Sequence, residues 1–243
     1  MIGVAVCQPM RIIYSDGYIP AEIIDQDRQQ IDADMKAAHA AFRAALGDRI
    51  PASEWRPAIT YLPLAEQLAK EARCADLVIT AVDQKLSMFD TARHVEVGDL
   101  VMQLGRPCLV VPAGVERLAL NHVVIGWKDS GETRRAVSDA LPLLRLAGRV
   151  TVIEIAAEDD LDDASGRVKD VAFWLNRHGI AAAALTAAST GDDAGHLDAI
   201  MQEQRADLIV AGAYGHSRLR EWVLGGVTRD LLLKAKRCAL VAH

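Results

Sequence analysis

Four glycines near the carboxyl end of the chain have the spacing of a phosphate-binding loop. Gly212, Gly215, Gly225 and Gly226 follow an apolar run at 207–211, predicted to be a buried strand, and precede the segment VTRDLLLKA, predicted to be a helix. Glycine lets backbone N–H groups approach an anion without an intervening Cβ, and the helix that follows presents unpaired N–H groups and a positive dipole end. The stretch therefore predicts a site for a phosphate-bearing ligand.

The G-x2-G-x9-G spacing between a strand and a helix resembles the nucleotide-binding motif of the universal stress protein family. The resemblance implies that ATP or another adenine nucleotide is the ligand, with or without Mg²⁺. It carries this set of residues onto the site: Gly212, Gly215, His216, Ser217, Gly225, Gly226, Val227 and Thr228. Arg218, within the glycine loop, is a further candidate for contact with phosphate oxygens. The family motif ends in Gly followed by Ser or Thr. Gly226 stands at that hydroxyl position, which predicts weaker binding.

A second departure from the family pattern follows the apolar run at 122–127. Nucleotide-binding members usually place Asp-Gly-Ser there, whereas this chain has Trp127-Lys128-Asp129-Ser130, with Lys128 at the Asp position. Asp129 has two candidate roles, a ligand contact after a one-residue shift or the N-cap of the next helix. Trp127 is a candidate for stacking on a base, or for the core. The alternative for the glycines themselves is a tight strand-to-helix connection that binds nothing.

Two segments of the chain occur twice. Ala75-Asp-Leu-Val-Ile-Thr-Ala resembles Ala206-Asp-Leu-Ile-Val-Ala-Gly, and Arg106-Pro-Cys-Leu-Val-Val resembles Lys236-Arg-Cys-Ala-Leu-Val. The offsets are 131 residues for the first pair, counted from Asp to Asp, and 130 for the second, counted from Cys to Cys. Such regularity indicates a tandem duplication, with one repeat at 1–115 and the other at 121–243.

The second repeat alternates short apolar runs with amphipathic stretches, which is typical of a parallel sheet covered on both faces. Strands are predicted at 122–127, 150–156, 181–186, 207–211 and 239–242, and helices after 129–132 and around 168–177 and 197–204. The first of these helices has the apolar stripe Ala136, Val137, Ala140, Leu141 and Leu144. The acidic run at 158–163 is predicted to be a solvated loop before a helix. This order of elements again resembles a universal stress protein domain.

The first repeat begins at what corresponds to the second strand of the later copy. Its Ile2-Gly-Val-Ala-Val aligns with Val150-Thr-Val-Ile-Glu, so the opening strand and helix of the repeat are missing. In the family fold that strand lies at the centre of the sheet, and its loss would leave neighbouring strands without ladder partners. We expect an N-terminal truncation, from a misassigned start or a shortened chain. A rearranged half-sheet or pairing with another chain is the alternative.

The remainder of the first repeat predicts two helices and a strand. Ile31, Met35, Ala38, Phe42 and Ala45 lie along one helix face, with Gly47 suited to the C-cap. A second helix is expected from 63 or 64 to 72, and a strand at 76–81. The loop that follows at 82–97 contains no glycine, so this repeat is predicted to be a structural partner that does not bind nucleotide in the family manner.

Composition narrows the class of protein. The net charge of −6 argues against a nucleic-acid-binding domain. No signal peptide and no apolar run of about 18 residues is present, so we expect a cytoplasmic protein without a membrane partner. Cys7, Cys74, Cys108 and Cys238 lack metal-ligand spacing and are expected to be small buried hydrophobes, and no metal site is predicted.

The sequence thus predicts a tandem α/β protein, with two doubly wound parallel-sheet (Rossmann-like) domains of the universal stress protein type, the first incomplete. The resemblance implies a stress-response role with adenine-nucleotide sensing by the second domain and no rapid turnover. It also implies that the last strands of the two repeats pair within the chain, with further homodimerisation open. Two alternatives remain: an interaction module with a protein partner and no nucleotide, and a slow nucleotide hydrolase. The sequence contains neither a P-loop nor a G-x-S-x-G motif, so no motif of these enzyme classes supports a catalytic function.

Overall fold

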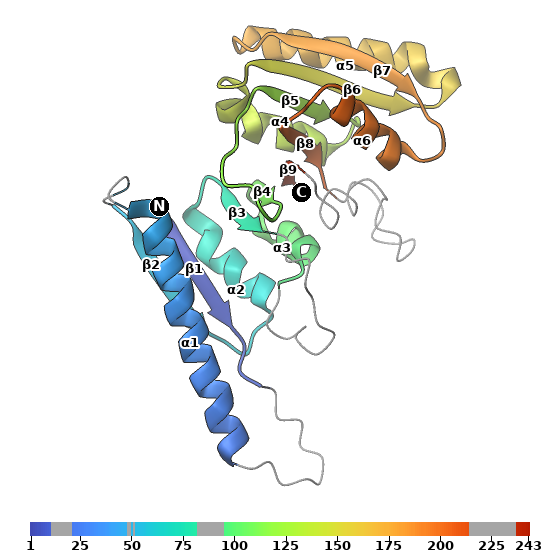
Figure 1. Ribbon diagram of the computed structural model, residues 1–243. Coiled ribbons are helices and arrows are strands. Elements are labelled where there is room, and N and C mark those ends of the chain that lie inside the picture. The colour runs from blue at the N-terminus through green and yellow to red at the C-terminus, as the bar shows by residue number, and fades with distance from the viewer. Residues whose placement is uncertain (11–20, 48–49, 51, 82–94, 214–236) are drawn as a thin grey trace. The chain divides into compact units, whose positions relative to one another are not determined.

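The computed structural model describes residues 1–10, 21–47, 50, 52–81, 95–213 and 237–243 (Figure 1). The described elements belong to two compact units, and each unit is described separately. One unit contains β1 (Ile2–Cys7), α1 (Ala21–Leu46), β2 (Glu54–Ile59) and α2 (Leu64–Glu71), followed by a 3₁₀ turn at Ala72–Cys74. Every later strand and helix belongs to the other unit.

The larger unit is built on a seven-stranded sheet with the order β3-β4-β9-β8-β5-β6-β7. Its strands are β3 (Val78–Ala81), β4 (Cys108–Val111), β5 (His122–Gly126), β6 (Arg149–Ala156), β7 (Ala182–Ala188), β8 (Leu208–Gly212) and β9 (Cys238–Ala242). Its helices are α3 (Val97–Leu104), α4 (Gly131–Leu144), α5 (Leu161–Arg177) and α6 (Asp193–Glu203), with a 3₁₀ turn at Glu158–Asp160. Alternating α/β elements around a mostly parallel sheet confirm the predicted fold class.

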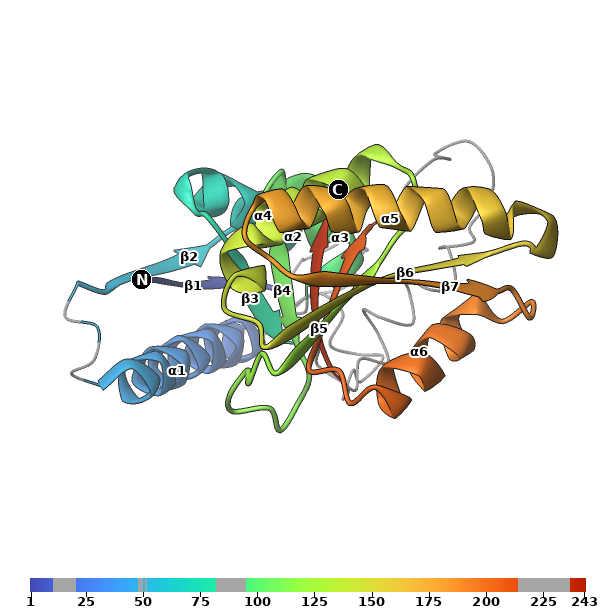
Figure 2. The same ribbon diagram turned by 90° about the horizontal axis from the view of Figure 1, so that it is seen from above.

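Helices cover both faces of the sheet at β5 and β6. In Figure 2, α4 and α5 lie on one side of these strands and α6 lies on the other. The strands at the centre are continuous apolar runs because both faces are covered: Val123, Val124 and Ile125 of β5 are all fully buried. The predicted stripe of α4 supplies much of the core, with Ala136, Val137, Ala140 and Leu144 buried.

The two repeats are joined through their last strands. β4 pairs antiparallel with β9, with Cys108 opposite Val241, Leu109 opposite Leu240 and Val110 opposite Ala239. All other strand pairs of the large sheet are parallel. The junction is buried, and it confirms the expectation that the final strands of the repeats pair within the chain.

The compact units follow a different boundary from that of the sequence repeat. β3, α3 and β4 come from the first repeat, yet they belong to the same unit as the whole of the second. The reason is the β4–β9 pairing, which continues the sheet of the second repeat into these strands. What the smaller unit retains of the first repeat is a two-stranded sheet with two helices.

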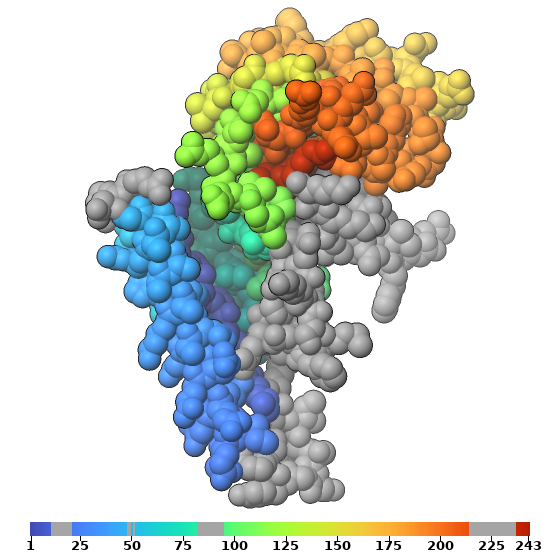
Figure 3. Space-filling view, viewed as in Figure 1, coloured from blue at the N-terminus to red at the C-terminus, as the bar shows by residue number. Residues whose placement is uncertain are grey.

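The smaller unit differs from expectation in two respects. The helix predicted from Ile31 onward is present as α1, but Ala38 and Ala45 of its stripe are exposed. Two strands offer too little apolar surface to cover so long a helix, and Figure 3 shows the side chains of α1 lying along the surface. The strand β2 is not among the predicted elements, and it contains Pro57. Proline is tolerated there because β2 has β1 as its single partner among the described strands.

Two expectations about the rest of the chain were wrong. The acidic run was predicted to be a loop, but Leu161, Asp162 and Asp163 form the first turn of α5. Carboxylates are favourable there because the amino terminus is the positive end of the helix dipole. Cys74 is exposed, whereas Cys7, Cys108 and Cys238 are buried as expected. None of the described helices has the length and apolarity needed to cross a membrane.

Candidate functional site

The large sheet has a topological switch point between β5 and β8. From β5 the chain proceeds to β6 and β7 on one side, then crosses back to β8 and β9 on the other. β5 and β8 are parallel neighbours, with Gly126 opposite Ala211, so their carboxyl ends lie side by side. In open α/β sheets, ligands bind in the crevice outside the carboxyl ends of strands at such a point.

Four of the sequence-predicted site residues lie at this switch point. Trp127, Lys128 and Asp129 connect the end of β5 to α4, and Gly212 is the last residue of β8. The other predicted residues, Gly215, His216, Ser217, Arg218, Gly225, Gly226, Val227 and Thr228, lie outside the described residues. The fold thus brings the described members of the set to one edge of the sheet from two stretches far apart in sequence.

Gly212 allows the end of β8 to approach the first turn of α4. A Cβ at this position would lie 2.5 Å from the Thr133 backbone nitrogen and 2.6 Å from its Oγ1. These distances are too short for any side chain, and the Thr133 nitrogen belongs to a helix that cannot shift cheaply. Gly212 is therefore required for packing, and the same contact places the amino-terminal turn of α4 against the carboxyl end of β8.

Ser130, not Asp129, caps α4. The Ser130 side chain accepts a hydrogen bond from the Thr133 backbone N–H, over 3.3 Å. The Asp129 carboxylate instead forms an exposed ion pair with Arg134. The cap was expected one residue too early because both residue types serve as N-caps. Asp129 is consequently free of a capping role and lies at the surface of the switch point.

Trp127 and Lys128 have different environments. The Trp127 ring packs against the core on the α4 and α5 side of the sheet, and its backbone N–H donates to the Ile153 carbonyl over 2.7 Å. Its indole nitrogen is buried and has no hydrogen-bond partner within the described part of the chain. Lys128 is exposed. A cation therefore stands in solvent at the carboxyl end of β5.

The carboxyl ends of β8 and β9 supply residues that sequence reasoning missed. The Arg135 guanidinium donates to the His243 carbonyl, and the His243 ring lies with Nδ1 3.1 Å from the carbonyl oxygen of Ala213. Arg135 belongs to α4, so the end of the sheet is tied to that helix here as it is at Gly212. No motif announces these contacts, because they depend on which strand ends meet.

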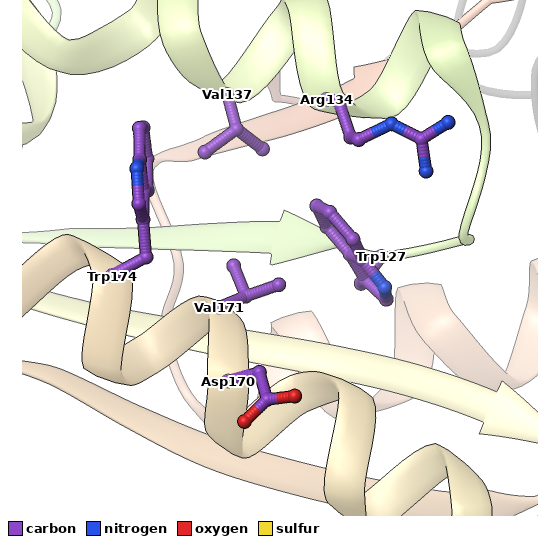
Figure 4. A pocket seen from close by; sticks show the side chains of 6 residues that line it. All are labelled: Trp127, Arg134, Val137, Asp170, Val171 and Trp174. Atoms are coloured by element: carbon purple, nitrogen blue, oxygen red, sulfur yellow. The ribbon is translucent and has the colours of Figure 1, made fainter.

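A cavity of about 370 Å³ lies beside α4 and α5 in the larger unit (Figure 4). It is lined by Trp127, Arg134, Val137, Asp170, Val171 and Trp174. The two tryptophans stand on opposite sides of the hollow, with the two valines between them. Its size and its mostly apolar walls, with Arg134 and Asp170 as the charged groups, are those of a small-molecule pocket. Trp127 thus links two places, since its backbone belongs to the switch point and its ring to this cavity.

An ion-pair network fixes α5 to β6. The Arg167 guanidinium donates to the buried Glu154 carboxylate over 2.7 Å and to Asp160 over 2.7 Å. The hydrogen bond from Arg167 lowers the pKa of Asp160, and the two carboxylates raise the pKa of Arg167. Charge-assisted bonds of this kind are short and directional. The network has a structural role, since it attaches α5 to β6, and both of its carboxylates are already paired with Arg167.

No metal centre is present in the part of the chain that the structure describes. There, no three His, Cys, Asp or Glu side chains are grouped so that they could hold an ion. Burial raises the pKa of the Cys108 thiol to about 12, so this cysteine is an inert core residue at neutral pH.

Comparisons with known proteins identify the fold. A universal stress protein from Archaeoglobus fulgidus DSM 4304 matches with a TM-score of 0.69, covering 98% of this chain and 83% of that one at 15% identity. A putative universal stress protein from Pseudomonas aeruginosa UCBPP-PA14 matches with a TM-score of 0.59, covering 99% and 92% at 14% identity. No protein-family model and no curated protein sequence matches the chain. The chain therefore has the fold of the universal stress proteins in a tandem arrangement.

Proposed function

We propose that this protein acts in a stress response of the universal stress protein type and that its second repeat binds an adenine nucleotide, ATP first, without rapid turnover. One observation carries the proposal. Trp127, Lys128, Asp129 and Gly212, chosen from the sequence, all lie where β5 and β8 end at the switch point of the sheet. That is the place where open α/β sheets hold their ligands.

The surroundings of the switch point suit an anionic ligand. The first turn of α4 lies against the end of β8, and a helix amino terminus favours negative charge through its N–H groups and dipole. The Asp129 carboxylate is not used in capping, and its ion pair with Arg134 lies exposed at the same end of β5. The glycine-loop residues at 215–228 complete the proposal from the sequence.

Nucleotide binding is tested by thermal denaturation of the purified full chain at increasing ATP, ADP and GTP, with and without Mg²⁺. A ligand that binds the folded state raises the melting temperature in proportion to the logarithm of its concentration above Kd. We expect a larger rise with ATP and ADP than with GTP. Phosphate release measured on the same samples separates binding from turnover.

Lys128→Asp sharpens this test, because it restores the carboxylate that the family resemblance places there. Lys128 is exposed, so the substitution should change the free energy of unfolding by less than about 0.5 kcal/mol. We expect ATP to raise the melting temperature of this variant more than that of the natural sequence. Lys36→Glu, in the exposed part of α1, provides a charge-matched control and should behave as the natural sequence does. An equal ATP-dependent rise in the melting temperature of all three proteins would show that the nucleotide does not bind beside position 128.

A further inference from the structure

The cavity beside α4 and α5 is a different place from the switch point of the sheet. The switch point is the crevice outside the carboxyl ends of β5 and β8, whereas the cavity lies between two helices that cover one face (Figure 4). All the residues that line it belong to the larger unit. The proposed nucleotide site therefore leaves this cavity without a ligand.

The spacing of residues along the two helices explains why these side chains meet. On α5, Asp170 and Val171 come four and three residues before Trp174, so all three lie on one side of the helix. On α4, Arg134 comes three residues before the buried Val137. The walls are thus carried by regular helices, which position their side chains more precisely than loops do.

The two tryptophans favour a flat aromatic ligand. The rings of Trp127 and Trp174 stand on opposite sides of the hollow, so a planar ring system between them contacts both (Figure 4). The Trp174 ring also packs against the His178 ring, with centroids 4.4 Å apart, yet Trp174 is 37% exposed and a ligand can bury more of it. A volume of about 370 Å³ is large enough for two fused rings.

The charges of the cavity favour a cation. The Asp170 carboxylate has no ion pair or hydrogen bond to another residue in the described ranges. Arg134 also lines the cavity, but its guanidinium is paired with Asp129. Arg167, three residues before Asp170 on α5, is engaged by two other carboxylates. The charge left unpaired among the lining residues is therefore negative, and the faces of tryptophan rings attract cations as well.

We propose that this cavity binds a planar aromatic cation, a fused heteroaromatic ring system with a positive charge, between Trp127 and Trp174 and with the charge beside Asp170. Val137 and Val171 contact the apolar body of the ligand. Coulombic attraction to the carboxylate and cation–π attraction to the indoles act together on the same charge. Binding here requires neither the glycine loop nor a nucleotide.

The test measures the affinity of 1-methylquinolinium for the full chain by isothermal titration calorimetry at about pH 7.5 without nucleotide. Quinoline has nearly the same shape and is uncharged at that pH, so it isolates the contribution of the charge. Asp170→Asn removes the carboxylate from the cavity. Asp162→Asn removes the same charge from the first turn of α5 and is the matched control, since both aspartates are exposed. Trp174→Leu removes one aromatic wall.

We expect saturable binding of 1-methylquinolinium at one site, and binding of quinoline about tenfold more weakly. Asp170→Asn should weaken the cation about tenfold and leave quinoline unchanged, whereas Asp162→Asn should bind both as the natural sequence does. Trp174→Leu should weaken both ligands. Melting temperatures without ligand should be alike for the two aspartate variants and the natural sequence, which shows that folding is not at issue.

Three results would overturn the proposal: no saturable binding of 1-methylquinolinium, equal affinities for the cation and quinoline, or equal affinities of Asp170→Asn and Asp162→Asn for the cation. A Trp174→Leu protein that binds both ligands as before would also overturn it. Nucleotide is absent throughout, so none of these results depends on the nucleotide proposal.

Discussion

At the scale of single residues, Gly212 is the position of the switch point that packing constrains most tightly. Its missing side chain lets the carboxyl end of β8 lie against the first turn of α4. The sequence singled out this glycine as part of a ligand loop, and the structure supplies a packing reason for it as well. Gly212 can therefore be required both for ligand binding and for packing, and only its contact with Thr133 reveals the packing requirement.

Gly212→Ala should destabilise the protein by about 2 kcal/mol, because the new Cβ meets the backbone of α4. The measurement is urea denaturation at neutral pH. Gly131→Ala, at the first position of the same helix, is the control, since a Cβ there meets nothing within 4 Å. A Gly212→Ala protein as stable as the Gly131→Ala protein would show that this contact is wrong.

His122 gives a pH dependence that can be checked. It is buried, with Nε2 2.9 Å from the Thr151 Oγ1, and burial, aided by the nearby Arg149 charge, lowers its pKa below 6.5. The unfolded chain then binds a proton more readily than the folded one. The stability contributed by neutral His122 is complete above pH 6.5 and is lost as the pH falls from there toward the lower folded pKa.

The free energy of unfolding of the natural sequence should therefore decrease between about pH 7.5 and about pH 5.5, by more than that of His122→Gln. Gln cannot titrate, so the variant isolates the contribution of this ring from those of other groups. Parallel pH profiles for the two proteins would show that His122 titrates alike in the folded and unfolded chain.

At the scale of elements, the second repeat was predictable because β5, β6, β8 and β9 are buried strands whose sequences are nearly uninterrupted apolar runs. The smaller unit was less so. The strand β2, which contains Pro57, was missed, and the exposed Ala38 and Ala45 belong to a stripe whose sequence alone suggested a buried face. Gly212 was found from its spacing, and Trp127, Lys128 and Asp129 were found from the family resemblance. The contacts of Arg135 and His243 depend on tertiary structure and have no sequence pattern.

The attachment of α5 to β6 depends on Arg167. Arg167→Met should destabilise the protein by about 2 kcal/mol, because it leaves the buried Glu154 carboxylate unpaired. The double variant Arg167→Met/Glu154→Gln should recover much of that loss, since no buried charge then remains. Chemical denaturation of the two variants measures the difference. Additive losses in the double variant would show that the pair is not coupled.

At the scale of the whole molecule, the β4–β9 pairing decides which parts unfold together. β3 and β4 belong to the first repeat by sequence and to the second by structure. Native-state hydrogen exchange in increasing denaturant should therefore give β4 amides the same opening free energy as those of β8 and β9. The β1 and β2 amides should open at a lower free energy. If the β4 amides instead opened at the same free energy as those of β1 and β2, the β4–β9 pairing would not join the two repeats.

The tandem fold gives one switch point with a complete set of strands, and the central claim is that this switch point holds an adenine nucleotide. The most direct test is to denature freshly purified protein and identify the released small molecules by chromatography and mass spectrometry. We expect ATP, ADP or AMP to be released in stoichiometric amount, either from the protein as purified or after ATP has been supplied to it. No nucleotide released, together with a melting temperature that millimolar ATP leaves unchanged, would contradict it and favour an interaction module of the same fold.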